Sequence, residues 1–469
     1  MTKRTYPYMP GSVPAAKQAL LRELGIDSVE VLLKDIPDDL RFPGKMKLPP
    51  PLLEEYELKR HVQAVLAGNA NCQEYISFLG AGCYQHYVPA VCDEVNSRAE
   101  FLTAYCGETY SDHGKMQAIF EYCSLMAELL DLDVVSYTLY DGGQAAASAL
   151  RMATRITGGT RVLVPATMHP EVLSQLQDYC RPVAQVVPVQ TDADSGRLNL
   201  EDLQAKLTPG TAAVFVENPT YLGAIETDVR EIATLVHSQQ ALFVVSADPS
   251  SLGLLESPAN YGADIVVGDI QPLGMHMQYG GGCGGFIATR DEPEFINQYP
   301  TYLYGITTTQ REGEYGWARA LNYRTSHEGR EKANEYFGTE SGLWAITAAV
   351  YLSLMGPQGL RELGETIVYR SNYARQVFSA LPGVEARFTG PIFKEFVLNF
   401  DACGRSVASI NKALLEYGIF GGKDLSQDFP HLGQSALFCV TEVITQADIQ
   451  RLACALQEIL AGERGNGND

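Results

Sequence analysis

Short apolar runs alternate with helical stretches through the middle of the chain, and this order constrains the fold more than any other feature. The runs are strand-like in length and are separated by turns that carry Gly, Pro or Asp. They cover residues 161–164, 185–188, 212–216, 242–245 and 264–267, and the helical stretches are 170–179, 199–207 and 228–239. Strand-helix-strand alternation of this length predicts an α/β fold with a largely parallel sheet covered on both faces.

The pattern changes near residue 330, which predicts a second, smaller domain. A long helix is expected from Ser341 to Leu354, before Gly356-Pro357, and the last helix is expected to start at Thr445 with Asp448 completing a capping box. We predict an N-terminal helical arm at 1–64, a large α/β domain at 65–330 and a smaller C-terminal α/β domain at 331–469. The arm either wraps a neighbouring subunit or packs on its own domain.

Charge and composition exclude several classes of function. The 469 residues carry a net charge of −21, which argues against binding to nucleic acid or to anionic membranes. No apolar run is long enough to span a bilayer, and the first residues lack a secretory signal, so we predict a cytoplasmic protein. The ten cysteines include no CxxC pair, so we expect reduced thiols and no metal site.

Four residues form an ordered series of candidate cofactor contacts. Asp141 and Gly142 lie in a turn whose small residues allow a phosphate to approach a helix N-terminus. His169 follows a strand and could stack on a flat ring, and Asp248 could pair with a pyridinium nitrogen. Each also has a plain structural interpretation, as a tight turn, a packed histidine or a cap.

A lysine is missing where this series would need one. The order of turn, histidine and aspartate is typical of pyridoxal-phosphate enzymes, which hold the cofactor through a lysine amine. The chain has no lysine between Lys206 and Lys332, and Gln271 and Pro272 stand at the expected place. No P-loop and no GxSxG motif is present either. The sequence therefore predicts no catalytic residue in this chain and points to a partner subunit that supplies the amine.

Segments along nearly the whole chain resemble the first (α) subunit of the two-subunit P-protein family of glycine decarboxylases. The resemblance rests on Phe78-Leu79-Gly80-Ala81-Gly82, on Gln271-Pro272-Leu273-Gly274 and on further segments. These are residues 7–10, 86–91, 100–105, 117–122, 140–142, 248–249, 251–255, 261–268, 350–354 and 439–442.

The resemblance implies a fold-type-I, aminotransferase-like architecture and a role within an enzyme. In that family the β subunit carries the cofactor lysine, after a histidine, at the place of Gln271 and Pro272. The resemblance thus implies that this chain binds no cofactor, that pyridoxal phosphate sits in a β partner, most simply in an α2β2 assembly, and that the chain is not catalytic alone. It also implies oxidative decarboxylation of glycine, with the aminomethyl group passing to the lipoyl arm of H-protein.

Three segments depart from the family pattern, at residues 106–114, 281–285 and 333–340. Glu108, Tyr110 and His113 in the first segment are candidates to line the cleft toward the β subunit, and the alternative is that they only shape turns. The departures leave two other functions open, a paralogue that acts with a β subunit on another small amino acid and a non-catalytic scaffold or regulatory subunit.

Overall fold

The computed structural model describes residues 8–9, 12–42, 44, 46–102, 113–320, 329–333, 335–337 and 340–462. The chain divides into an N-terminal unit, Met1–Ala70, and a main unit, Asn71–Asp469. The further boundary near residue 330 stays a prediction.

The N-terminal unit has no core of its own. It contains the helices α1 (Pro14–Glu23) and α2 (Glu55–Leu66) and two short 3₁₀ turns, η1 (Val29–Leu33) and η2 (Asp38–Leu40). Pro14 begins α1 at a position where the missing N–H costs nothing. None of the described residues of this unit is buried, although α1 carries leucines and α2 carries leucines and valines. The apolar side chains of this unit therefore need a covering surface outside it.

A seven-stranded sheet forms the centre of the main unit, in the order β2-β8-β7-β6-β5-β3-β4. The five strands predicted from the sequence run parallel to one another, whereas β8 is antiparallel to β7 and β2 is antiparallel to β8. The strands are β2 (Val134–Val135), β3 (Arg161–Pro165), β4 (Gln185–Val189), β5 (Thr211–Asn218), β6 (Leu242–Ala247), β7 (Ile265–Asp269) and β8 (Gly285–Thr289). The prediction of a mostly parallel α/β sheet is confirmed.

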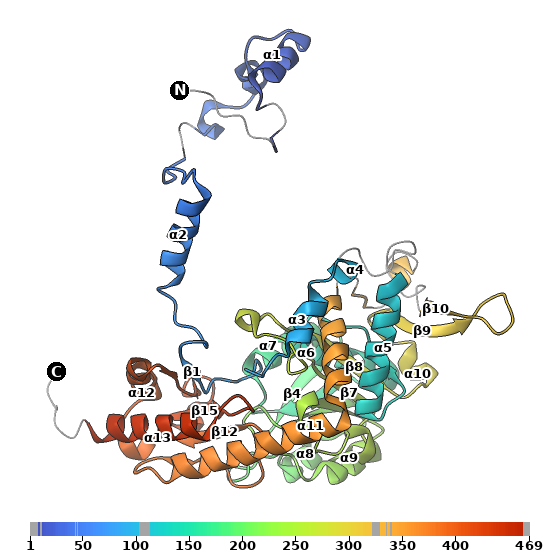
Figure 1. The fold of residues 1–469 in the computed structure, drawn as a ribbon. Helices are drawn as coiled ribbons and strands as arrows, with labels where there is room; N and C mark the ends of the chain where they lie inside the picture. Colours follow the sequence, from blue (N-terminus) through green and yellow to red (C-terminus); the bar gives the residue numbers. More distant parts are fainter. Residues whose placement is uncertain are drawn as a thin grey trace. The chain divides into compact units, whose positions relative to one another are not determined.

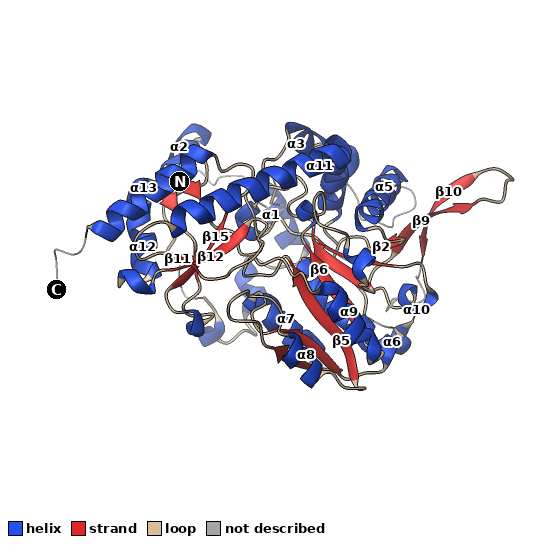
Figure 2. Ribbon diagram, turned by 90° about the horizontal axis from the view of Figure 1, so that it is seen from below, coloured by secondary structure: helices blue, strands red, loops and turns tan. Residues whose placement is uncertain are grey.

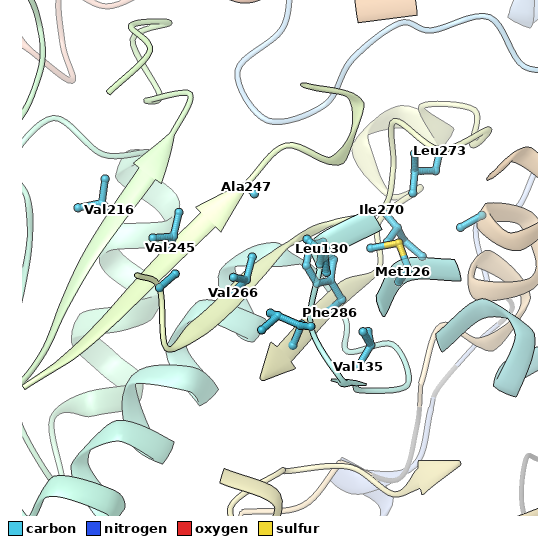
Figure 3. Packing of buried hydrophobic residues seen from close by; sticks show 14 of the residues in the cluster. Met126, Leu130, Val135, Val216, Val245, Ala247, Val266, Ile270, Leu273 and Phe286 are labelled. Atoms are coloured by element: carbon cyan, nitrogen blue, oxygen red, sulfur yellow. The ribbon is translucent and has the colours of Figure 1, made fainter. Parts of the chain in front are cut away.

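Alternate side chains of the sheet enter two separate cores, because successive residues of a strand point to opposite faces. Val214 and Val245 pack on one face, whereas Phe215 and Val244 pack on the other. The first face is covered by α5 (His113–Leu130), α8 (Leu200–Lys206), α9 (Val229–Ser238) and α11 (Gly342–Ser379), and the second by α6 (Gly142–Thr157), α7 (Pro170–Cys180) and α10 (Pro293–Ile296). Figure 2 shows helices around the red strands of this sheet, and Figure 3 shows the first core, where Met126 and Leu130 of α5 lie near Val266 and Phe286.

A second, antiparallel sheet with the order β11-β12-β15-β14 lies in the C-terminal part of the main unit. Its strands are β11 (Glu385–Ala386), β12 (Glu395–Asn399), β14 (Lys423–Asp424) and β15 (Ser435–Cys439), and β1 (Ile76–Ser77) pairs separately with β13 (Ile419–Phe420). The helices α12 (Val407–Leu414) and α13 (Gln446–Ala461) pack against this sheet. Thr445 and Asp448 form the predicted capping box at the start of α13.

Three further elements complete the main unit. The helices α3 (Ala90–Asn96) and α4 (Ala99–Leu102) precede α5 along the chain. The strands β9 (Leu303–Thr308) and β10 (Tyr315–Ala320) pair as an antiparallel hairpin, which projects from the main unit in Figure 1.

The helix α11 is longer than the sequence pattern predicts. It begins at Gly342, is interrupted at Gly356 (φ 58°, ψ −177°), and continues from Pro357 to Ser379. Proline starts a helix as readily as it ends one, which is why the second half was missed.

Among the described residues, α11 is the helix whose length and composition would suffice to cross a membrane. Residues along it, including Ala345, Ala348 and Ile367, belong to the hydrophobic core.

The aromatic cluster under the second sheet gives a direct test of this packing. Phe378 is fully buried, and its ring centroid lies 6.0 Å from those of Phe78 and Phe438. We expect Phe378→Ala to lower the free energy of unfolding by about 3–5 kcal/mol, because it removes a buried ring and leaves a cavity. Urea denaturation would measure this loss. Tyr369→Ala, on the same helix but 76% exposed, is the matched control and should cost less than about 0.5 kcal/mol; equal losses for both variants would contradict the packing.

Candidate functional site

A cavity of about 410 Å³ lies at the carboxyl ends of the parallel strands. Glu217 and Asp269 come from the ends of β5 and β7, and Asp248 follows β6. The N-termini of α6 and α7, the loop 81–84 and the residues Lys394 and Glu395 complete the walls. Open α/β sheets bind their ligands at this edge, so the cavity is the candidate functional site.

Carboxylates of the chain itself occupy the N-terminus of α6. Asp141 caps the helix by accepting a hydrogen bond from the backbone N–H of Gln144 (2.7 Å). Asp269 accepts from the backbone N–H groups of Gly142 (2.9 Å), Gln271 (2.8 Å) and Gly284 (3.2 Å). Burial raises the pKa of Asp269 to about 7. The N–H groups of Gly142 and Gln144 are therefore already used by carboxylates, and a phosphate here would face two acidic side chains.

The buried side chain of Gln271 acts as a clamp, and with Pro272 it stands where the resemblance predicts a histidine followed by the cofactor lysine. Its side chain is fully buried, and its Oε1 accepts from the backbone N–H of Tyr84 (3.0 Å). Its Nε2 donates to the backbone oxygens of Tyr84 (2.9 Å) and Met275 (3.2 Å). Pro272 lines the cavity but offers no amine. Gln271 thus holds the loop 81–84 against the edge of the large sheet.

Asp248 forms an internal ion pair with a lysine that the sequence reasoning missed. Its Oδ1 accepts from the backbone N–H (3.0 Å) and the hydroxyl (2.7 Å) of Ser250, and its Oδ2 lies 2.5 Å from Lys394 Nζ. Burial pushes the pKa of Asp248 upward, but the Lys394 ammonium and Ser250 outweigh burial, so this pKa lies below its usual value. Asp248 therefore caps a turn, which is the structural interpretation given for it above. Its negative charge is balanced by Lys394 of the same chain.

Lys394 has no donor left for a ligand. It is 3% exposed, its Nζ lies 3.4 Å from the ring centroid of Tyr84, and it is 3.5 Å from Nε2 of His86. Nδ1 of His86 in turn lies 2.8 Å from Glu442 Oε2, so this ring donates to Glu442 and accepts from Lys394. The only sequence signal for this lysine is the charged pair Lys394-Glu395 at the start of an apolar strand.

His169 caps α7 and supports the loop 81–84. Its Nδ1 accepts from the backbone N–H of Glu171 (3.1 Å), and its Nε2 donates to the backbone oxygen of Ala81 (3.0 Å). Burial lowers the pKa of His169, so the ring is neutral. Gly82 (φ +98°) lies against this ring, and a Cβ there would come within 3.3 Å of it. The structure places both ring nitrogens of His169 in hydrogen bonds within the chain.

Three carboxyl groups of the cavity share a raised pKa. Burial is the main cause at each, and it brings the pKa of Glu217, Asp269 and Glu395 to about 7. Glu395 accepts from the backbone N–H of Ala81 (2.7 Å) and from the hydroxyl of Tyr84 (3.0 Å). Sequence reasoning missed Glu217 and Glu395, because nothing in their local patterns distinguishes them from other strand residues.

The candidates in the divergent segments are only partly described. Glu108 and Tyr110 lie outside the described residues, and His113 begins α5 without a described side chain. In the segment 281–285, Cys283 lines the cavity, next to Gly280. In the segment 333–340, Glu335 binds Arg151 and Arg155 at 3.3 and 3.7 Å, away from the cavity walls.

The residues of this cavity do not fit pyridoxal phosphate. Gln271 and Pro272 offer no amine at the position expected for an anchoring lysine, and the carboxylate of Asp269 accepts from Gly142 at the N-terminus of α6. The acid that would face the pyridinium nitrogen, Asp248, is paired with Lys394. The structure brings Asp141, Gly142, His169 and Asp248 together, yet all four are engaged within the chain.

Known proteins match the chain over almost its full length. The family model described as glycine cleavage system P-protein matches residues 8–456. A probable glycine dehydrogenase (decarboxylating) subunit 1 of Staphylothermus marinus is 37% identical and covers 97% of this chain and 98% of its own length. The protein of the same name from Carboxydothermus hydrogenoformans is 38% identical, with 98% and 99% covered.

Solved structures agree with these matches. A crystal structure of glycine decarboxylase (P-protein) of the glycine cleavage system in inhibitor-bound form superimposes with a TM-score of 0.84 and 33% identity, covering 97% of this chain and 100% of that one. A sphingosine-1-phosphate lyase of Burkholderia pseudomallei shares only the fold, with a TM-score of 0.64 and 14% identity over 90% of this chain and 94% of that one.

The pKa of Glu395 gives a pH-dependent test of the site. An unfolded glutamate ionises near pH 4.3, whereas folded Glu395 ionises near pH 7, so its burial costs free energy that is fully present above pH 7 and vanishes below about pH 4.3. Glu395→Gln stays neutral and keeps an acceptor for Ala81. We expect this variant to be more stable than the parent by about 1–3 kcal/mol at pH 8, with the gain shrinking toward pH 5.

Urea unfolding at several pH values would check this expectation. Glu201→Gln, which removes an exposed carboxylate outside the cavity, is the control and should show no such trend. A difference between parent and Glu395→Gln that is the same at pH 5 and pH 8 would contradict the raised pKa.

Proposed function

Because the chain belongs to the P-protein family of the glycine cleavage system, we propose that it works as the subunit without cofactor in a two-subunit glycine decarboxylase. The chain is an α subunit of glycine dehydrogenase (decarboxylating), an oxidoreductase. The names of its relatives favour glycine over the two alternatives, a paralogue for another amino acid and a non-catalytic scaffold. A partner subunit is implied by the same names.

One observation in particular supports our proposal that the partner subunit, and not this chain, holds the cofactor. Gln271 and Pro272, at the position expected for a histidine and the anchoring lysine, offer no amine, and Lys394, which lines the cavity, is committed to Asp248. In our proposal, pyridoxal phosphate is therefore held by a lysine of the partner subunit. There it supplies the electron sink for decarboxylation of glycine, and this chain supports the assembly and the substrate cleft.

The rest of the proposal concerns assembly. The aminomethyl group passes to the lipoyl arm of H-protein, the two subunits form an α2β2 complex, and the complex is cytoplasmic. Glu108, Tyr110 and His113 remain candidates for the cleft between the subunits. The exposed apolar side chains of the N-terminal unit, among them Leu20 and Leu58, support the existence of a covering partner surface.

Reconstitution tests this proposal. We expect glycine-dependent release of carbon dioxide, with H-protein present, only when the chain is mixed with its lysine-bearing partner, because neither chain holds the complete machinery. Size-exclusion chromatography of the co-expressed chains should show one complex. Separate peaks for the two chains, or full activity of the partner alone, would refute the proposal.

Borohydride reduction tests the location of the cofactor. A Schiff base reduced by borohydride becomes a stable, absorbing pyridoxyl-lysine, so we expect this label on the partner chain after incubation of the complex with pyridoxal phosphate. No stoichiometric label should appear on this chain, alone or in the complex. A labelled peptide that contains Lys394 would show that this lysine has left Asp248. It would contradict our proposal that the partner subunit holds the cofactor.

A further inference from the structure

Two cysteines line the cavity from separate parts of the chain. Cys83 belongs to the loop 81–84, and Cys283 belongs to the divergent segment 281–285. Both are free thiols, and both are partly exposed. The proposed function uses neither of them.

One short turn of the backbone, residues 277–283, accepts hydrogen bonds from both thiols. The thiol of Cys83 donates to the backbone oxygen of Met277 (3.8 Å). The thiol of Cys283 donates to the backbone oxygen of Gly280 (3.4 Å). The oxygen of Met277 also accepts from the N–H of Gly280 (2.7 Å), so the acceptors of the two thiols are joined by a hydrogen bond. This turn therefore brings together two cysteines that are far apart in the chain.

The electrostatic surroundings of the two thiols agree with this closeness. Burial is the main cause that raises the pKa of Cys283 to about 12, and the charges of Asp269 and Cys83 raise it further. Burial and then Asp269 raise the pKa of Cys83 as well. Because the effect of a charge weakens with distance, Cys83 must lie near Cys283, and both must lie near Asp269.

The backbone of the turn has the freedom that a bond between the thiols requires. A disulfide places the two Cβ atoms about 3.5–4.5 Å apart, so neighbouring cysteines often have to shift slightly to form one. The glycines 280–282 precede Cys283, and glycine adopts most backbone angles without strain. Gly280 has φ +91° and no atom within 4 Å of the place where a Cβ would lie, and Tyr279 beside it is fully exposed. The turn can therefore move Cys283 toward Cys83 without disturbing the core.

We propose that Cys83 and Cys283 form a reversible disulfide that ties the loop 81–84 to the turn 277–283. The hydrogen bonds of Gln271 already hold this loop at the cavity, and the disulfide adds a covalent link to a second wall. The redox state of the surroundings thus controls whether these two walls can move apart. The inference goes beyond the proposed function and does not depend on it.

The oxidant is a small disulfide such as oxidised glutathione. The thiolate of one cysteine attacks a sulfur of this disulfide, which forms a mixed disulfide and releases one thiol. The thiolate of the other cysteine then attacks the protein sulfur of the mixed disulfide, and the second thiol leaves. The two cysteines lose two protons and two electrons, and the small disulfide takes them up as it becomes two thiols.

Oxidation of the full chain with oxidised glutathione tests the inference. The reaction is run at about pH 8.5, because the raised pKa values keep both thiols protonated at neutral pH and the thiolate is the reactive form. It is stopped with acid, and the remaining free thiols are then blocked with N-ethylmaleimide.

Digestion with chymotrypsin, without a reductant, separates the two cysteines from all others. Cleavage after Phe78 and Tyr84 releases the first cysteine in a peptide of its own. Cleavage after Tyr279 and Phe286 does the same for the second. We expect mass spectrometry to find these two peptides joined, at least about tenfold more abundantly than any other pair of cysteine peptides, because the fold holds the two thiols close together.

Three controls separate the folded pair from general thiol reactivity. Cys454 is exposed on α13, so it should carry glutathione, and Cys454→Ser should change the yield of the joined peptides less than about twofold. Cys283→Ser should abolish the joined peptides and leave Cys83 free or bound to glutathione. In concentrated urea the preference for this pair should disappear, because it depends on the folded turn.

Any of three results would overturn the inference. Cys83 and Cys283 could both stay free or carry only glutathione, which would mean that the turn does not bring them within bonding distance. Either cysteine could join a different one instead, such as Cys106, which lies outside the described residues. Finally, an equal preference for the pair in urea would show that the fold does not select it.

Discussion

The hydrogen bonds of Gln271 to the backbone of Tyr84 join the two halves of the main unit at the cavity. The segment that leads to Tyr84 is hydrogen-bonded at Phe78 to the C-terminal part of the main unit. The backbone N–H of Phe78 donates to the backbone oxygen of Phe420 in β13, and its backbone oxygen accepts from the N–H of Cys439 in β15. A single buried amide thus fixes a loop that begins at one sheet to the edge of another. The loop also contacts two other lining residues of the cavity, His169 and Glu395, through Ala81.

The cavity is held together by groups of the chain itself where related folds use a cofactor. The helix N-terminus binds Asp269, and Asp248 binds Lys394. Buried ion pairs of this kind are costly to separate, since either partner left alone would be an unpaired charge in a low-dielectric site. The cavity therefore keeps its form without a bound phosphate, and its excess of carboxylates repels one.

Packing explains how the chain keeps a fold-type-I architecture with no lysine between Lys206 and Lys332. The large sheet, its two covering layers and the cavity at the carboxyl edge arise from packing, which does not involve the lysine. The amide side chain of Gln271 can donate and accept hydrogen bonds at once. Gln271 uses both abilities on the backbone of Tyr84, so its role is structural.

Local patterns in the sequence were sufficient for the fold and for part of the site. Short apolar runs placed the parallel strands, and the capping pattern placed the start of α13 at Thr445, because each depends on neighbours a few residues away. The missing lysine was likewise visible in the sequence. Nothing local marked the continuation of α11 beyond Pro357.

Only the tertiary structure decided how the cavity is charged. The cavity is lined by Glu217 of β5 and by Lys394 and Glu395 at the start of β12, which are far apart in the chain. Whether a carboxylate is buried or paired depends on what packs beside it. The sequence by itself determined that this chain has an α/β core and no lysine between Lys206 and Lys332, since apolar runs and residue identity are local properties. The pairing of Asp248 with Lys394 and the raised pKa of Glu395 arise from long-range contacts and desolvation, which no local pattern contains.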